Sequence, residues 1–413
     1  MPILRTAFVV TSLLWTAVEL GLSARQIACV RRHRDQVPAD FATTVTPAEH
    51  RKAADYTVAH EKLDALQTVL GLTTSLLWVC GGINILFGAL AGVLPSPALG
   101  VAFMIALWAI EAILSLPFSL YSTFVLEEKF GFNRSTLATF AVDTLKSWLI
   151  GLIIAVPLLF ACLWAMRHLA GFWWLWTWCG VVALMLGAPM VYIYLIAPRF
   201  NTFTPLPDGD LRSRVETLMT QCGFKSSGLF TMDASRRSAH GNAYFIGFGN
   251  TKRVVLFDTL IAANTPEEIG AVIAHELGHY WHKHVLFGLL RGAAIAFGVL
   301  AAFGWLSKQP WLLPSFGFAY QDDALALNAC LLLSAMVSPI LRPFSNWISR
   351  RNEFQADAFA CRHAGAAPMI SALVKLSRDN ASTLTPDDLY ALLHYSHPPV
   401  PIRVRHLQTI PAG

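Results

Sequence analysis

Long apolar stretches recur along this chain and alternate with shorter polar segments. Seven of them approach or exceed the length that a helix needs to cross about 30 Å of hydrocarbon. They lie at residues 6–24, 68–94, 98–120, 147–166, 172–197, 285–305 and 324–345. The second and third stretches are close enough to form one long hairpin. The pattern therefore predicts a mainly α, polytopic membrane protein with seven transmembrane helices.

The composition supports this class of protein. Of the 413 residues, 55% are hydrophobic and only 14% are charged, and the mean hydropathy is +0.50. Such values are typical of polytopic membrane proteins. The first apolar stretch is interpreted as a span and not as a cleaved signal peptide, because Glu19 interrupts it and no A-x-A pattern follows. The seven cysteines form no CxxC pair and are expected to be free thiols.

Basic residues mark alternate loops. They are numerous after the first span, absent between the second and third, and present again at 121–146, which predicts an outer N-terminus and an inner C-terminus. The formal net charge of +5 reflects this bias. Because basic and aromatic residues do not cluster, we do not expect nucleic-acid binding.

Two polar blocks interrupt the membrane pattern and define four segments. The segments are 1–197 with five spans, 198–284, 285–345 with two spans, and 346–413. The block at 198–284 contains a predicted helix near 208–222 and strand-like runs at 228–232, 242–248 and 253–257, which predicts a small α+β domain. The block at 346–413 is expected to be mostly helical. The charge pattern places both blocks and the 121–146 loop on the inner face, where they can assemble one site.

The segment His275-Glu276-Leu277-Gly278-His279 carries the most specific chemistry. Two histidines four residues apart lie one above the other on a helix, where they can bind Zn²⁺, and the glutamate between them can reach a metal-bound water. By itself this motif also occurs by chance in long chains, so the rest of the sequence has to support it.

A helix around the motif is favoured by its first residues. Thr265, Pro266 and Glu268 provide an N-cap, a first-turn proline and the N3 glutamate of a capping box. Because no proline intervenes before Phe303, we expect this helix to continue into the sixth span. The metal would then lie within a turn or two of the membrane.

A catalytic zinc takes three protein ligands and leaves one position for water. Glu353, directly after the last span, is the predicted third ligand. Asp357, one helical turn further on, is expected to accept a hydrogen bond from the distal ring nitrogen of a ligating histidine. Glu276 would deprotonate the water and pass the proton to the leaving amine. The alternative interpretation makes Glu353 and Asp357 a solvated helix face beside Arg350 and Arg351.

Several motifs in the chain resemble those of the integral-membrane zinc CAAX prenyl endopeptidases, a gluzincin family. Besides the zinc motif, the matching segments are Thr123–Asn133, Phe203–Pro207, Asn242–Phe245 with Gly247-Phe248-Gly249, Val255–Leu260, Glu353–Asp357, and His394–Pro399 with Arg403. This resemblance implies an endopeptidase that removes the last three residues from a prenylated C-terminal C-a-a-X sequence. It also implies one Zn²⁺ per chain and a water-filled chamber enclosed by seven helices.

The resemblance further implies roles for individual residues. The substrate would lie as an added strand along Asn242, Ala243 and Tyr244, with Asn242 holding its backbone. His397 and Arg403 would be catalytic, stabilising the oxyanion or holding the substrate C-terminus. His284 matches a recurring histidine but lies off the ligand face, so we expect it to be structural.

Intramembrane polar groups need partners. Glu111, Asn84 and Arg291 are expected to face the chamber or to pair with one another.

The natural substrate is less constrained than the chemistry. The short tail and the tryptophan- and alanine-rich spans suit a bacterial inner-membrane protein with its catalytic parts on the cytoplasmic side; a eukaryotic member would lie in the endoplasmic reticulum. Bacteria generally do not prenylate their own proteins, so membrane-protein quality control is an alternative role. A non-enzymatic transporter or scaffold is a further alternative. The oligomeric state is not predicted.

Overall fold

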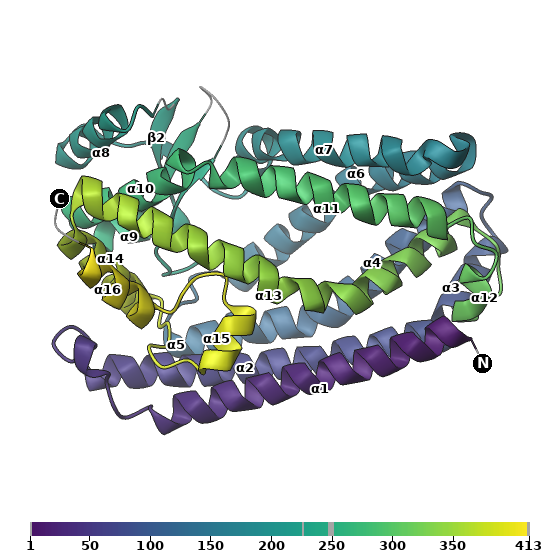
Figure 1. The fold of residues 1–413 in the computed structure, drawn as a ribbon, viewed down its shortest axis with the longest axis horizontal. Helices are drawn as coiled ribbons and strands as arrows, with labels where there is room; N and C mark the ends of the chain where they lie inside the picture. Colours follow the sequence, from purple (N-terminus) through teal and green to yellow (C-terminus); the bar gives the residue numbers. More distant parts are fainter. Residues whose placement is uncertain (1, 225–226, 247–251, 411–413) are drawn as a thin grey trace.

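Seven long apolar helices form most of the molecule in the computed structural model, which describes residues 2–224, 227–246 and 252–410 (Figure 1). Within these residues the spans are Ile3–Arg32, Pro47–Ala91, Ala98–Phe130, Leu137–His168, Trp173–Arg199, His284–Leu306 and Asp323–Ala364. Each overlaps one predicted stretch; the second predicted stretch runs three residues past its span, and five spans extend well beyond their predicted stretches. The prediction of a seven-span, mainly α membrane protein is confirmed, whereas the enclosed chamber stays a prediction.

Three of the spans contain a π-helical turn. The second is α2 (Pro47–Leu77), η2 (Trp78–Gly82) and α3 (Ile83–Ala91); the third is α4 (Ala98–Tyr121), η3 (Ser122–Glu127) and α5 (Glu128–Phe130); the fifth is α7 (Trp173–Val191), η5 (Tyr192–Ile196) and the 3₁₀ turn η6 (Ala197–Arg199). The others are α1 (Ile3–Arg32), α6 (Leu137–His168), α11 (His284–Leu306) and α13 (Asp323–Ala364). Short elements η1 (Ala39–Phe41), η4 (Ala170–Phe172) and α12 (Leu312–Phe316) lie in the connections. Such π-turns occur frequently at functional sites.

The block between the fifth and sixth spans forms a small sheet with helices. Its elements are β1 (Phe203–Pro205), α8 (Asp210–Gln221), β2 (Gly228–Met232), η7 (Ala234–Arg236), β3 (Ala243–Ile246), β4 (Arg253–Phe257), α9 (Asp258–Ala263) and α10 (Pro266–Trp281). The strand order is β1-β2-β4-β3, with β2 and β4 parallel and the other pairs antiparallel. The predicted helix and three strands are present, although residues 247–248 of the second predicted run, and the Gly247-Phe248-Gly249 motif, lie outside the described residues. Strand β1 and helix α9 were not predicted, since each is too short to show a period.

Helix α10 does not continue into the sixth span, contrary to our expectation. It ends at Trp281, and Lys283 adopts a left-handed conformation with φ 55° before α11 begins at His284. The absence of proline only permits a continuous helix; here the chain leaves the helical path at His282 and Lys283 and starts a new helix. The break changes the direction in which the His284 side chain points.

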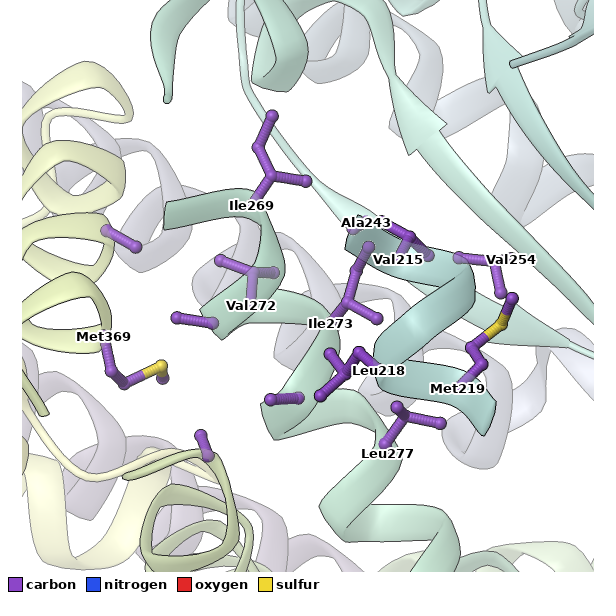
Figure 2. Packing of buried hydrophobic residues seen from close by; sticks show 14 of the residues in the cluster. Val215, Leu218, Met219, Ala243, Val254, Ile269, Val272, Ile273, Leu277 and Met369 are labelled. Atoms are coloured by element: carbon purple, nitrogen blue, oxygen red, sulfur yellow. The ribbon is translucent and has the colours of Figure 1, made fainter. Parts of the chain in front are cut away.

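A hydrophobic core holds α10 in place (Figure 2). Ile269, Ile273 and Leu277, four residues apart, are each no more than 1% exposed and pack among α8, the sheet and α14 (Ala366–Asp379). Burying side chains of this size contributes about 1.5–3 kcal/mol each. This face fixes the helix so that its other side carries the histidines.

Helix α13 crosses α10 at very short range. A Cβ atom added to Gly278 would lie 2.9 Å from Ala356 Cα and 3.0 Å from Phe359 Cβ. Only a glycine lets the two backbones approach this closely. The crossing brings the last third of α13 next to the histidine motif, and α15 (Asp388–His394) and α16 (Val400–Thr409) complete the C-terminal part.

Two of the polar groups in the spans, Glu111 and Asn84, have hydrogen-bond partners other than each other. Glu111 accepts a hydrogen bond from Trp78 Nε1 at 2.5 Å. Asn84 donates to the Gly317 carbonyl at 2.9 Å and accepts from the Ala319 N–H at 3.0 Å. Glu111 and Asn84 therefore do not pair with each other, and the alternative expectation, that these groups face the chamber, stays a prediction. The seven cysteines are free, as expected.

Candidate active site

The first turn of α10 is fixed by a capping box. Thr265 Oγ1 accepts from the Glu268 N–H at 3.4 Å, and Glu268 Oε2 accepts from the Thr265 N–H at 2.8 Å. Glu268 also accepts hydrogen bonds from Ser371 at 2.6 Å and from Lys375 at 2.7 Å, both on α14. The capping residues read from the sequence therefore also anchor the helix to the C-terminal part.

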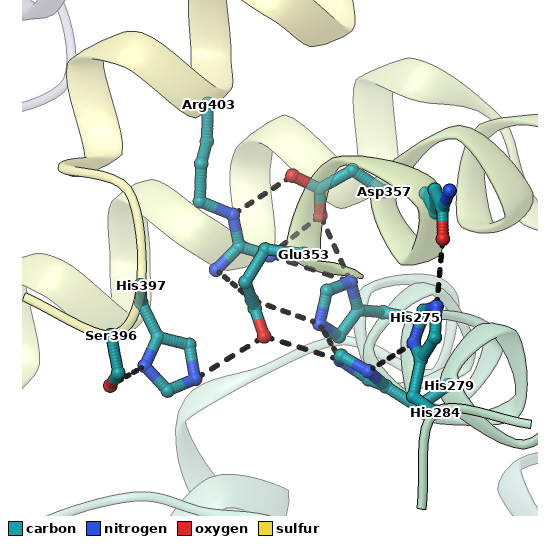
Figure 3. A network of polar contacts seen from close by, with 9 residues as sticks. His275, His279, His284, Glu353, Asp357, Ser396, His397 and Arg403 are labelled. Carbon is teal, nitrogen blue, oxygen red and sulfur yellow. Dashed lines mark hydrogen bonds and ion pairs between the residues drawn. The ribbon is translucent and has the colours of Figure 1, made fainter. Parts of the chain in front are cut away.

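Three potential metal ligands converge between α10 and α13 (Figure 3). His275 Nε2 lies 3.2 Å from His279 Nε2, and Glu353 carboxylate oxygens lie 3.4 Å and 3.3 Å from these two nitrogens. All three ligand atoms lie within 4.8 Å of one another. Glu353 Oε2 is buried and has no hydrogen-bond partner among the described residues. Two imidazole nitrogens and a buried carboxylate oxygen without a hydrogen-bond donor, all facing one point, fit a divalent metal such as zinc.

A carboxylate beside the second ring nitrogen of His275 orients this ligand. Its Nδ1 lies 2.9 Å from Asp357 Oδ1, and Asp357 is itself 0% exposed. A carboxylate at this nitrogen fixes the imidazole tautomer and leaves Nε2 free as a ligand. Asp357 was expected at this position from its spacing of one turn after Glu353.

The second histidine has a partner that we did not foresee. His279 Nδ1 lies 3.0 Å from His284 Nδ1, and His284 Nε2 lies 2.8 Å from Gln355 Oε1. A helix that continued through His284 would place this residue off the ligand face, as the sequence predicts. The break at Lys283 returns its ring to His279, so a predicted break would have been the signal needed to find this contact.

Arg403 is buried beside the ligand cluster. It is 7% exposed and donates two hydrogen bonds to Asp357, from Nε at 2.9 Å and from Nη2 at 2.6 Å. Its Nη1 lies 3.4 Å from Glu353 Oε2. Burial alone would lower the pKa of Arg403, but the bonds and charges of Asp357 and Glu353 raise it, so it stays a cation. The guanidinium group contacts Asp357 and Glu353 inside the site and is not exposed on an open face.

Glu276 and His397 lie next to the ligand cluster, Glu276 partly buried and His397 exposed. No hydrogen bond or ion pair holds the Glu276 carboxyl among the residues that the structure describes, and burial raises its pKa, an effect that His275 and His279 partly offset. The His397 side chain is 65% exposed, and its Nε2 lies 3.4 Å from Glu353 Oε1 (Figure 3). Both groups can therefore meet a molecule that enters the site.

The strand expected to receive substrate lies at an edge of the sheet. Strand β3 pairs only with β4, so its other edge is unpaired within the described chain. Ala243 is buried and Tyr244 is partly buried, whereas Asn242 is exposed and its Oδ1 accepts from the Ala243 N–H at 2.8 Å. β3 also contacts α10, which places this edge beside the helix that carries the histidines.

A polar network links the start of β3 to the membrane helices. Glu127, at the end of η3, lies 3.3 Å from His240 Nε2 and accepts a hydrogen bond from Tyr56 at 2.6 Å. Asn380 Oδ1 lies 3.1 Å from His240 Nδ1 and accepts from the Gly241 N–H at 3.1 Å. Sequence reasoning assigned no role to His240, which stands alone in a polar loop and shows no spacing to any other ligand type.

The fold and the site together define an integral-membrane metallopeptidase. The sequence agrees with this class over nearly its whole length: residues 26–202 match the family "CAAX prenyl protease N-terminal, five membrane helices", and residues 205–410 match "Peptidase family M48".

Individual proteins of similar sequence or structure support the same class. The chain is 39% identical over 309 residues to an Arabidopsis thaliana CAAX prenyl protease 1 homolog, covering 74% of this chain and 72% of that protein. It is 33% identical over 331 residues to CAAX prenyl protease 1 of Saccharomyces cerevisiae, covering 76% and 73%. The crystal structure of S. mikatae Ste24p superposes with a TM-score of 0.91 at 27% identity, covering 98% of each chain. The chain belongs to peptidase family M48, in the CAAX prenyl protease group, and is a membrane metalloendopeptidase.

Proposed function

We propose that the metal is Zn²⁺, one per chain, held by His275, His279 and Glu353. The observation that carries the proposal is the convergence of these three ligand atoms within 4.8 Å, with Glu353 Oε2 buried and without a hydrogen-bond partner among the described residues. A bound zinc ion would polarise the substrate carbonyl and make a water molecule more acidic. The remaining chemistry falls to the side chains around it.

In this proposal Glu276 is the general base and acid. Its carboxylate takes a proton from the attacking water and later delivers that proton to the leaving amine as the peptide bond breaks. Glu276 suits this task because its carboxylate forms no hydrogen bond or ion pair with another side chain in the described structure.

His397 is proposed to donate a hydrogen bond to the oxyanion that develops on the carbonyl oxygen. Its exposure and its 3.4 Å distance from Glu353 favour this role. Arg403 is proposed to hold Asp357 in position, and its role toward the oxyanion or the substrate C-terminus, implied by the resemblance, stays a prediction. Asn242, Ala243 and Tyr244 would bind the substrate backbone as an added strand.

The substrate proposed for this chain is a peptide whose C-terminal region carries a prenylated C-a-a-X sequence, as the names of its relatives describe. The catalytic parts would face the cytoplasm, with the N-terminus on the other side of the membrane. Cleavage of membrane-associated peptides regardless of a prenyl group, as in quality control, is the alternative. A bacterial inner membrane suits the second role better.

The decisive experiment compares two peptides of identical sequence, one prenylated at its C-a-a-X cysteine and one not. Purified full-length protein is assayed with each, before and after removal of metal by a chelator and after readdition of zinc. Preference for the prenylated peptide supports the first role, whereas equal cleavage overturns prenyl specificity.

A second measurement tests the metal ligands. The zinc content of the purified protein, measured by elemental analysis, should be near one per chain and should fall sharply in the double variant His279→Ala/Glu353→Gln. Zinc content that is unaffected by those changes would contradict the ligand set and favour a scaffold.

A further inference from the structure

Helix α15 is a short helix that the rest of the chain holds in place. It has seven residues, Asp388–His394, and lies beside α1 and α13 (Figure 1). A helix of this length is not stable on its own in water, because its first turn fixes several residues for a single hydrogen bond. Its position is therefore set by the groups that contact its two ends. The segment that carries His397 begins directly after it, at Tyr395.

The position of His397 depends on the backbone of that segment. Its side chain is exposed, and within the described residues its polar contacts are to the neighbouring Ser396 Oγ, 3.0 Å from Nδ1, and to Glu353 Oε1, 3.4 Å from Nε2 (Figure 3). Pro398 and Pro399 follow, and a proline ring fixes φ at about −65°. The chain after His397 is therefore stiff, and the imidazole keeps its place only if the backbone before it is fixed as well.

Helix α13 holds the carbonyl groups at the end of α15. Asn346 Nδ2 donates to the Leu393 carbonyl at 2.8 Å, and Arg350 Nη1 donates to the Tyr395 carbonyl at 2.6 Å. The last carbonyls of a helix have no partner within it, so these side chains complete the end of α15. Arg350 lies three residues before Glu353 on the same helix, so its bond ties the segment to a proposed metal ligand.

A fully buried amide of the first span contacts both ends of α15. Gln26 is 0% exposed and lies near the end of α1. Its Oε1 accepts from the N–H of Asp387, the residue that caps the start of α15, at 2.7 Å. Its Nε2 donates to the Tyr395 hydroxyl at 3.2 Å, directly after the end of α15. Burying an amide is costly unless it is hydrogen-bonded, so one side chain both satisfies itself and ties the two ends of the helix together.

Two further polar contacts with α1 are less well shielded from water. Arg25 Nη2 lies 3.0 Å from Asp387 Oδ2, and Glu19 Oε2 lies 2.6 Å from His394 Nε2. The side chains of Arg25 and Glu19 are 58% and 27% exposed, and water weakens such pairs. The buried bonds of Gln26 are therefore the contact with α1 on which the position of α15 depends most.

From these contacts we infer that Gln26 of the first span is a positioning residue, because it fixes the backbone that carries His397. The consequence for turnover rests on the role proposed above for His397 as the donor to the oxyanion, whereas the ordering of the segment does not. The first transmembrane helix contributes none of the three proposed metal ligands. Through Gln26 it is nevertheless required for full peptidase activity.

Two variants of the purified full-length protein test the inference. Gln26→Met keeps the length of the side chain and removes both hydrogen bonds, whereas Tyr395→Phe removes only the hydroxyl and leaves the bond to Asp387 intact. Hydrogen exchange of the backbone amides, followed by mass spectrometry of the peptide that covers residues 388–397, measures local order. Each lost bond should speed this exchange by about fivefold, so we expect about fivefold for Tyr395→Phe and about 30-fold for Gln26→Met.

Steady-state cleavage of the better of the two peptides described above tests the consequence. In both variants kcat should fall by about the same factors as exchange rises, with KM within about twofold, because an oxyanion donor acts in the transition state. In a His397→Ala background the donor is gone, so adding either variant should change kcat by at most about twofold. The control Trp15→Phe removes a hydrogen bond from α1 to the Met336 carbonyl of α13 and should change neither exchange nor kcat.

Unchanged exchange in both variants would overturn the inference, and so would a fall in kcat that is equally large with and without His397. A His397→Ala protein that cleaves at the wild-type rate would refute the proposed oxyanion role, and exchange would still decide whether Gln26 holds the segment. Thermal unfolding verifies that each variant is folded. If Gln26→Met does not fold, Tyr395→Phe, which keeps the bond at the start of α15, decides the outcome.

Discussion

Glu127 of the third span and His240 of the peptidase segment lie 3.3 Å apart, although 113 positions separate them in the chain. Their contact joins a π-helical turn in the membrane region to the loop that leads into β3. Asn380 and Thr259 hold the same loop from the other side, Thr259 by donating to the His240 carbonyl at 2.9 Å. The start of the proposed substrate strand is therefore held by membrane and peptidase parts together.

Removing the charge of Glu127 should weaken substrate binding more than chemistry. In Glu127→Gln we expect KM to rise about three- to tenfold, the effect of losing one charge-assisted hydrogen bond, with kcat within about twofold. Steady-state kinetics checks the split. Glu128→Gln makes the same change at the next residue, which bonds Asn133 and not His240, and should leave KM unchanged. A fall in kcat alone would contradict a positioning role.

Peptide binding should also depend on pH through His240. The hydrogen bond with Glu127 raises the pKa of His240, against an opposing effect of burial. A raised pKa means that the charged pair is fully formed below the ordinary histidine value of about 6.5 and is lost as pH rises through the raised value. Affinity for an uncleaved peptide, measured by titration in a Glu276→Gln background, should fall across that range. Adding Glu127→Gln should flatten the curve, and an unchanged curve would refute the assignment.

Asp357 should matter for metal affinity without touching the metal. In Asp357→Asn the tautomer of His275 is less firmly fixed and Arg403 loses its charged partner. Loss of such an orienting carboxylate typically lowers metal affinity about 10- to 100-fold. Competition with a chromogenic zinc chelator measures it. Asp387→Asn, which disturbs a different ion pair with Arg25, should leave zinc affinity as in the wild type.

Glu276 should be required for turnover and dispensable for metal binding. Glu276→Gln keeps the shape of the side chain but cannot accept the proton, so cleavage should fall by at least about 10²–10⁴-fold. Zinc content should stay near one per chain by elemental analysis. A variant that keeps full peptidase activity would remove Glu276 from the mechanism.

Gly278 should be intolerant of even a methyl group. In Gly278→Ala the new Cβ would meet the Ala356 backbone at 2.9 Å, so α10 and α13 would have to separate. Overpacking of this kind costs about 1–3 kcal/mol. Thermal unfolding should show the loss, and zinc affinity should fall with it because the crossing sets the ligand distances. Gly288→Ala, where no atom lies within 4 Å of the new Cβ, is the control and should behave as wild type.

The sequence was sufficient for features that depend on long periodic segments or on fixed local spacing. Seven spans follow from their apolar length, and the capping box of α10 follows from Thr265, Pro266 and Glu268. The spacing of four residues on α13 also placed Asp357 correctly relative to Glu353, and it contacts His275. Each of these relationships is decided within one helix.

The remaining features depend on contacts between distant segments or on single backbone angles. The left-handed residue Lys283 has no signal in its neighbours, so the break after α10 and the contact of His284 with His279 could not be predicted. The burial of Arg403 against Asp357 depends on how α16 packs on α13, and the partner of His240 lies in the third span. No periodicity in the sequence encodes such pairings.

Helix α13 connects the far side of the membrane region to the metal ligands. Its 42 residues span about 63 Å, and it carries Asp323 at one end and Glu353 and Asp357 near the other. The two histidines, in contrast, belong to α10, which is separated from its neighbouring span by the break at Lys283. Pro339 and Pro343 interrupt the backbone hydrogen bonds of α13 between these two ends, so a shift of its first part can be absorbed as a bend before it reaches Glu353. The close packing of Gly278 on Ala356 meanwhile keeps Glu353 beside His275 and His279, so the three ligands move as one unit with the peptidase core.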